Sequence, residues 1–220
     1  MKTQQMFLWS LLWILFALYP NPMNLAVSLY RLYDPDIDSQ AVRILSANDE
    51  SNPANIETEL EKKIPYAHDW QVYGMPWYFP TVREVLEKGR GDCKAQAILF
   101  ASLLQGKRID NHISYSFTHM WVEYRHKPET ATEKADRTVV QLRYSPSPIL
   151  ALNEQGNGKK GNNTKEAPQV HIPIEIGGDQ LATMKSGLWD AMPAAKKREL
   201  VVGLAGIGLF WLAIFIWQKK

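Results

Sequence analysis

The segment with the clearest potential for chemistry is residues 89–93, GRGDC, whose cysteine opens the apolar stretch CKAQAILFASLLQ. Gly89 and Gly91 allow a sharp backbone turn and leave room for a substrate chain. The pattern predicts that Cys93 stands on the first turn of a helix, where open N–H groups and the helix dipole favour a thiolate. The charge of Asp92 opposes a thiolate unless that side chain is engaged in capping the helix. Cys93 is therefore the candidate nucleophile, and a neighbouring amide is a candidate oxyanion donor.

His119 is the candidate general base for that thiol. It opens the alternating segment 119–123 (HMWVE), which predicts a strand. A strand beside the N-terminus of the helix can bring an imidazole within hydrogen-bond reach of the thiol. Trp121 lies on the same strand face as His119, so we expect it to shield the pair from water. Together, Cys93 and His119 predict acyl transfer through a thioester.

These motifs resemble the transglutaminase-like superfamily over roughly residues 60–145. The matching features are Gly91-Asp92-Cys93, the Ala- and Leu-rich helix that follows, and His119-x-Trp121-x-Glu123. The resemblance implies a papain-like core, in which a Cys-bearing helix packs on an antiparallel sheet that carries the His and an Asp. It also implies a protein or peptide substrate cleaved at a peptide or side-chain amide, with no metal or organic cofactor. Family members include crosslinking acyltransferases, peptidases and peptide N-glycanases, and many bacterial members are tethered to membranes.

The family also uses an Asp that orients the imidazole, near the end of the strand after the His strand. Asp136, in Asp136-Arg137-Thr138, is the candidate for this third catalytic residue. It precedes the strand predicted at 138–144, however, and no carboxylate stands near Tyr144. An incomplete triad would give either a slower enzyme or a fold without catalysis.

Three interpretations of Cys93 follow. In the first, water or an amine resolves the thioester, and hydrolysis is preferred because the sequence displays no amine site. In the second, the domain is an inactive binding or assembly module at the membrane. In the third, the single cysteine is a small buried hydrophobe.

The two ends of the chain indicate a membrane protein. Residues 200–217 (LVVGLAGIGLFWLAIFIW) contain no charge and no proline. At about 1.5 Å per residue they extend about 27 Å, close to the roughly 30 Å of a hydrocarbon core. Residues 6–19 are a shorter apolar run closed by Pro20. It is either the apolar part of a cleaved signal sequence or an uncleaved anchor, and the anchor is preferred because no good cleavage site follows.

The expected location is a bacterial inner membrane, crossed by both end segments. Lys2 before the first segment, and few Lys or Arg soon after it, favour a central domain outside the cytoplasm. The run Lys196-Lys197-Arg198 argues for the opposite orientation. The lipid bilayer and other membrane proteins are therefore candidate partners.

Composition excludes several other classes of protein. A single cysteine rules out an internal disulfide, and without a Cys/His cluster a structural zinc site is not expected. The net charge of +2, with no dense basic stripe, argues against nucleic acid as a partner.

The order of elements predicts an α+β fold. Helices are expected at 81–88 and 93–105, and strands at 112–126, with a bend at Thr118, and at 138–144. Short helices are expected at 38–45 and 58–63, and an edge strand at 170–176. Residues 64–80, broken by Pro and Gly, are expected to form a structured loop. The predicted divisions are an N-terminal anchor (1–33), a linker (34–59), a transglutaminase-like domain (60–150), a polar linker with a short strand and helix (151–199) and a transmembrane helix (200–217).

Overall fold

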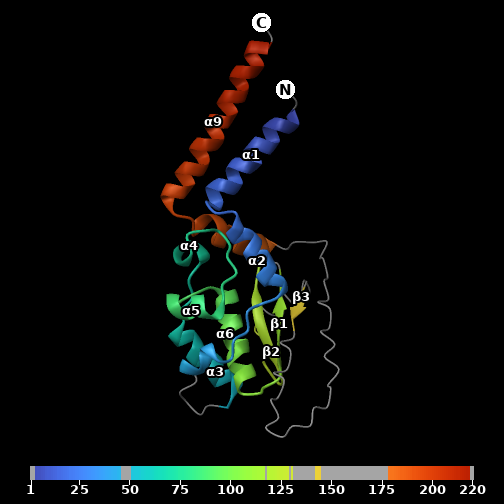
Figure 1. Ribbon diagram of the computed structural model, residues 1–220, viewed down its shortest axis with the longest axis vertical. Coiled ribbons are helices and arrows are strands. Elements are labelled where there is room, and N and C mark those ends of the chain that lie inside the picture. Colours follow the sequence, from blue (N-terminus) through green and yellow to red (C-terminus); the bar gives the residue numbers. More distant parts are fainter. Residues whose placement is uncertain are drawn as a thin grey trace.

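The computed structural model describes residues 3–45, 51–116, 118–128, 130, 142–144 and 178–218. Figure 1 shows two long helices, α1 and α9, that run side by side away from a body of shorter helices and a small sheet. Mixed helices and antiparallel strands confirm the predicted α+β class. Asp136 and the strand predicted at 170–176 lie outside the described residues.

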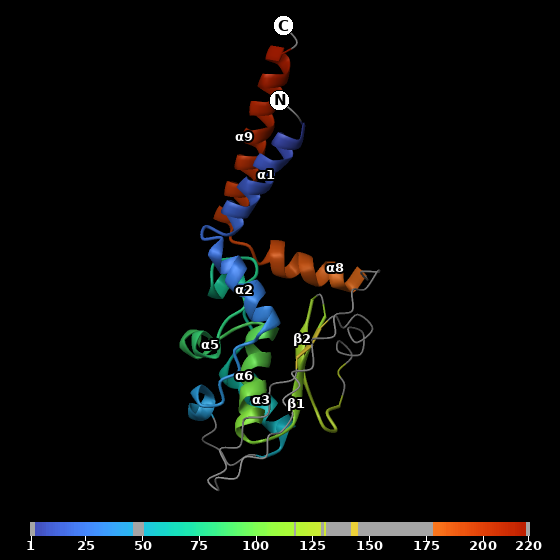
Figure 2. The ribbon, with the colours of Figure 1, turned by 45° about the vertical axis from the view of Figure 1, so that its right-hand side comes forward.

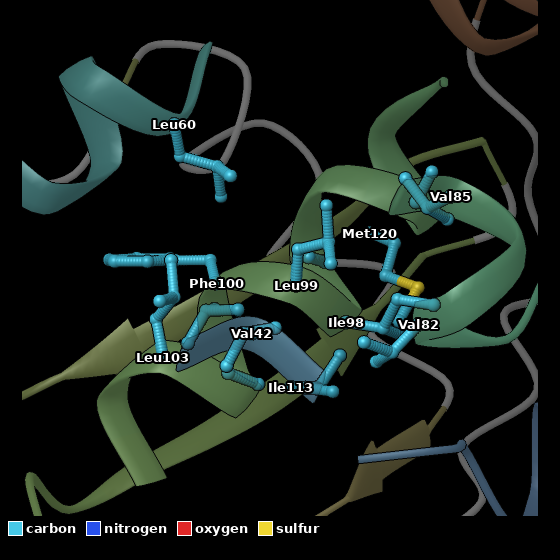
Figure 3. Packing of buried hydrophobic residues seen from close by; sticks show 14 of the residues in the cluster. Val42, Leu60, Val82, Val85, Ile98, Leu99, Phe100, Leu103, Ile113 and Met120 are labelled. Atoms are coloured by element: carbon cyan, nitrogen blue, oxygen red, sulfur yellow. The ribbon is translucent and has the colours of Figure 1, made fainter. Parts of the chain in front are cut away.

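Helix α6 (Cys93–Gly106) forms the centre of the body. Its residues are apolar on most faces, and those from Ala97 to Leu104 are all buried, as expected of a helix covered on several sides. One side packs on Ile113 and Met120 of the sheet, while another faces Val82 and Val85. Figure 3 shows these side chains gathered around α6. The helix that carries Cys93 is thus fixed by the hydrophobic core.

The sheet consists, in the described part of the chain, of β1 (Asn111–Tyr115), β2 (Met120–Tyr124) and β3 (Leu142–Tyr144). The order is β2-β1-β3 with antiparallel pairing throughout, so β2 stands at an edge. The register pairs Tyr115 with Met120, which makes β1 and β2 a hairpin with residues 116–119 as its connection. This agrees with the bend predicted at Thr118 and puts His119 directly before the edge strand.

Short helices cover α6 on its other sides. These are the 3₁₀ helix η1 (Ala41–Ile44), α3 (Pro53–Lys63), α4 (Asp69–Val72) and α5 (Val82–Lys88). Thr81 and Glu84 form a reciprocal capping box at the start of α5. Gly89 ends that helix with φ of 64°, a left-handed conformation that favours glycine. The chain then turns back at once into α6.

Two of these elements differ from what the sequence predicted. A short helix was expected at 58–63, but α3 begins earlier, within the segment assigned to a linker, because Asn52 caps it and Pro53 takes the first position. Helix α4 lies within the stretch 64–80, which its Pro and Gly residues suggested was a loop. It lasts a single turn and begins at a buried aspartate, Asp69.

The helices at the two ends of the chain are α1 (Thr3–Leu18), α2 (Met23–Tyr33) and α9 (Ala194–Gln218). Within the described residues, Ala194–Trp217 is the helix that is by itself long and apolar enough to cross a membrane. Phe7–Leu18 and Met23–Tyr33 meet that criterion only as a pair bent by 79°. Helix α8 (Gly178–Lys185) and the π-helix η3 (Ser186–Asp190) precede α9. Figure 2 shows α8 crossing between the long helices and the body.

Candidate active site

The turn before α6 holds Cys93 at the helix N-terminus. Asp92 caps α6 by accepting hydrogen bonds from the backbone N–H groups of Lys94 (3.1 Å) and Ala95 (3.3 Å). A Cβ atom at Gly91 would collide with the side chain of Ala95, so glycine is required there. Gly91 also donates its N–H to Pro65 (3.3 Å) and accepts one from Ala67 (2.9 Å). The glycine predicted to shape the turn therefore also ties it to the segment before α4.

A serine positions the backbone of His119. In the hairpin connection, the Ser116 N–H donates to the carbonyl oxygen of His119 over 2.8 Å. The Ser116 hydroxyl oxygen accepts the N–H groups of His119 (2.9 Å) and Thr118 (3.3 Å). These hydrogen bonds to Ser116 fix the backbone of His119 directly before β2.

Cys93 and His119 line the same cleft, a hollow of about 310 Å³. Helix α3 supplies Glu57 and Glu61 to its wall, and α6 supplies Gln96 next to the cysteine. The backbone N–H of Met120, the residue after His119, forms a hydrogen bond with the Cys93 sulfur. The structure therefore brings the first two predicted site residues to one cleft, while Asp136 lies outside the described residues.

Trp121 forms part of the same wall. Its ring stacks on that of His119, with centroids 5.6 Å apart and planes 14° from parallel. Trp121 is 4% exposed, although it lines the cleft. The stack confirms that the two side chains share a face. Because residues alternate along β2, that face is opposite to the one through which Met120 and Val122 pack in the core with α6, although both His119 and Trp121 line the cleft.

The thiol environment differs from the one the sequence suggested. Burial, followed by the charge of Asp92, raises the pKa of the Cys93 thiol to about 12. Lys94 and the Met120 N–H act in the opposite direction but do not compensate. The resting site thus holds a neutral thiol, whereas the helix N-terminus predicted a thiolate. Capping does not remove the effect of Asp92, because its charge stays close to the sulfur.

A buried ionic cluster lies behind the thiol. The Lys94 ammonium contacts Asp92 and lies 3.0 Å from Asp69 Oδ2. Lys94 is 8% exposed and Asp69 4% exposed. The two carboxylates raise the pKa of Lys94, which therefore stays charged. Burial raises the pKa of Asp69 to about 6, against the opposing effect of Lys94.

The sequence did not predict this cluster or the role of Ser116. A lysine in an otherwise apolar helix is normally expected at a solvent-facing position. The available signal was Lys94 itself, placed two residues after Asp92 on a helix predicted to be buried. Its partner Asp69 is 25 residues away in sequence, within a segment expected to be a loop.

The arrangement is suited to nucleophilic chemistry that begins from a neutral thiol. A thiol with a raised pKa attacks only if a base removes its proton during the reaction. His119 is the imidazole in the cleft. The N–H groups of Lys94 and Ala95 are taken up by Asp92, and the N–H that contacts the sulfur is that of Met120. No protein-family model matches the chain, and no curated protein is detectably similar to it in sequence.

Proposed function

We propose that this protein is a membrane-anchored cysteine hydrolase or acyltransferase of the transglutaminase-like kind, acting on peptide or side-chain amides. The main support is that Cys93 and His119 line one cleft. In addition, the backbone N–H of Met120, the residue after His119, forms a hydrogen bond with the Cys93 sulfur. A helix carrying the cysteine and an antiparallel sheet preceded by the histidine suit the papain-like core that the sequence motifs imply.

In the proposed reaction, the Cys93 proton passes to His119 as the sulfur attacks the substrate carbonyl carbon. The tetrahedral intermediate collapses, the C–N bond breaks, and the amine leaves with the proton from the imidazolium. Water then attacks the thioester while His119 accepts its proton. The C–S bond breaks, and the returning proton restores the thiol.

Water is the favoured acceptor because it requires no binding site of its own. The wall of the cleft combines apolar side chains with Glu57 and Glu61. Asp136 remains the candidate for the acid that orients His119. No residue of the reaction calls for a metal or an organic cofactor.

The anchoring proposed here uses both α1 and α9, in a bacterial inner membrane with the body outside the cytoplasm. The helices pack together: a Cβ at Gly203 of α9 would overlap the ring of Trp13 in α1. Lys196 of α9 also donates to the carbonyl oxygen of Ala17, over 3.3 Å. A 16-residue α1 is about 24 Å long, so it needs a neighbouring helix or a locally thinned bilayer to span.

The test uses an activated ester, because the natural substrate is unidentified. Purified full-length protein in detergent is mixed with p-nitrophenyl acetate, and intact mass follows acetylation of Cys93, the only cysteine. We expect His119→Asn to slow acetylation by roughly 10²-fold or more, the usual contribution of a general base. The matched control is His126→Asn, which alters an exposed histidine at φ of 63°, a conformation that asparagine tolerates.

The three interpretations of Cys93 give different outcomes. Equal acetylation rates in wild type and His119→Asn, with both proteins folded, would favour a binding module with an ordinary thiol. No acetylation of wild type under conditions that acetylate an introduced surface cysteine would identify a packed thiol. Either result overturns the proposed enzyme.

A further inference from the structure

The body is joined to the membrane helices at the end where α6 begins. Asp69 of α4 contacts Lys94 in the first turn of α6. The next residue, Trp70, donates its indole N–H to the carbonyl oxygen of Leu188 in η3 over 2.9 Å. Helix α9 begins only a few residues after η3, at Ala194. A short series of contacts therefore links the nucleophile turn to the base of the membrane helix.

A second set of contacts fixes the same end from the other side. The Tyr19 hydroxyl, just after α1, donates to the Trp77 carbonyl oxygen over 3.0 Å. In α2, the hydroxyl oxygen of Ser28 accepts the N–H of Phe79 over 3.0 Å. Arg31 of α2 reaches Glu84 of α5 at 2.9 Å. These bonds hold the body against both membrane-type segments and oppose its swinging away.

Helix α6 then runs away from the membrane helices, as Figures 1 and 2 both show. Its 14 residues make it about 21 Å long. Cys93 is the first of these residues, and the Met120 N–H bonded to its sulfur places the start of β2 at the same end. Cys93 and the start of β2 therefore lie at the membrane-proximal end of the body, and the cleft extends from there along α6 to Phe100 and α3.

The connecting segment, α8 and η3, has the composition of a segment that lies at a membrane surface. Leu188 is 40% exposed, Trp189 42% and Leu181 55%. The Lys197 ammonium lies 5.6 Å from the Trp189 ring centre. Exposed tryptophan and leucine beside lysine suit the boundary between headgroups and acyl chains. A segment at that boundary sets the height of the body above the bilayer.

We infer that the substrate of this site is a polypeptide segment next to the bilayer, such as the juxtamembrane part of another membrane-anchored protein. This inference rests on the proposed function and adds the class of substrate. A chain anchored in the same bilayer reaches the cleft at an effective concentration in the millimolar range, whereas a freely diffusing peptide does not.

The test measures the height of the cleft with a lipid-tethered reagent. Full-length protein is placed in phosphatidylcholine vesicles that contain phosphatidylethanolamine carrying iodoacetamide on a spacer of about 10 Å, half the length of α6. The measured quantity is the rate with this lipid divided by the rate with soluble iodoacetamide, which corrects for intrinsic thiol reactivity. Cys93 is compared with Asp110→Cys in a Cys93→Ser background, since exposed Asp110 follows the far end of α6.

We expect the ratio for Cys93 to exceed that for Asp110→Cys by at least about tenfold. If Cys93 does not react with the soluble reagent, Tyr66→Cys in the same background decides. Tyr66 is 57% exposed and pairs with Gly91 beside the nucleophile. Equal ratios at the two ends of the body overturn the inference.

A further arm separates this inference from the proposed function. The phosphatidylethanolamine is made to carry a p-nitrophenyl ester instead, and acylation of Cys93 is followed in wild type and His119→Asn. If the acylation rate depends on His119 but is no faster with the tethered ester than with p-nitrophenyl acetate, the proposed enzyme stands and the membrane-proximal substrate is ruled out. If the tethered ester reacts faster but its rate does not depend on His119, the cleft is close to the membrane and the proposed enzyme is ruled out.

Discussion

The Lys94 ammonium lies 3.0 Å from Asp69 Oδ2, and both side chains are buried behind the nucleophile. Lys94 also contacts Asp92, so one cation serves two carboxylates. Removing it would leave those carboxylates in a buried site with no charge between them. The first prediction concerns the stability that this cation provides.

We expect Lys94→Met to lower the free energy of unfolding at pH 7.5 by about 3–5 kcal/mol, as when one partner of a buried pair is removed. Thermal unfolding in detergent, followed by circular dichroism, measures the effect. The control is Lys62→Met, which removes a solvent-exposed lysine 2.8 Å from Glu59 and should change little. Similar losses for the two variants would show that the buried cluster contributes nothing special.

The second prediction is a pH dependence that comes from Asp69. Burial raises its pKa from 3.8 to about 6, so the folded protein binds this proton more tightly than the unfolded chain does. The contribution of Asp69 to stability is therefore greatest below about pH 4 and falls as the pH rises through 6. Asp69 Oδ1 is buried without a hydrogen-bond partner among the described residues, which makes it the natural site for that proton.

Comparing wild type with Asp69→Asn isolates this effect. The melting temperature of each is measured at pH 4.5 and pH 7.5, and the difference between the two pH values is compared. We expect the wild type to lose more stability between pH 4.5 and 7.5 than the variant does. A variant with an unchanged or larger loss would mean that Asp69 titrates in its ordinary range.

Local features of this structure could be predicted from the sequence, whereas contacts between distant segments could not. The apolar run that begins at Cys93 and the alternation around His119 were sufficient for a buried helix on antiparallel strands, because both patterns are local. The contact between Trp70 and Leu188 spans 118 residues and left no periodic signal. The sequence therefore predicted that Cys93 and His119 lie near each other, and both line one cleft, but it did not predict how the body is attached to α9.

The charge state of Cys93 was harder to predict for a different reason. The favourable effect of a helix N-terminus is local and can be inferred from sequence. The opposing effect, burial of the sulfur, depends on the packing of β2 and α3 around it. A nearby carboxylate adds to that effect even while it caps the helix, so identifying the cap correctly still gave the wrong direction for the pKa.

A third prediction follows from that carboxylate. Asp92→Asn retains a good helix cap and removes the charge that helps to raise the pKa of the Cys93 thiol. We expect this pKa to fall below about 12 and the rate of alkylation by soluble iodoacetamide at pH 8 to rise several-fold. Intact mass spectrometry of the full-length protein measures the rate.

The control for this experiment is Asp110→Asn, which removes the same charge beyond the far end of α6. The distance from Asp110 to Cys93, at the other end of α6, exceeds the screening length of about 8–10 Å at physiological salt, so the alkylation rate should not change. Equal rate increases in the two variants would point to net charge rather than to Asp92. An unchanged rate in Asp92→Asn, with its melting temperature preserved, would leave burial as the sole cause of the raised pKa.

The fourth prediction concerns the pairing of α1 with α9. Gly203 faces Trp13 so closely that any side chain would overlap the indole ring, whereas a Cβ at Gly206 meets nothing within 4 Å. Gly203→Val should therefore force the two helices apart and lower stability by about 1–3 kcal/mol through overpacking. Gly206→Val introduces the same residue into the same helix, so both variants carry the same change in helix propensity. Thermal unfolding in detergent should separate them, and equal melting temperatures would mean that α1 does not pack on α9 at Gly203.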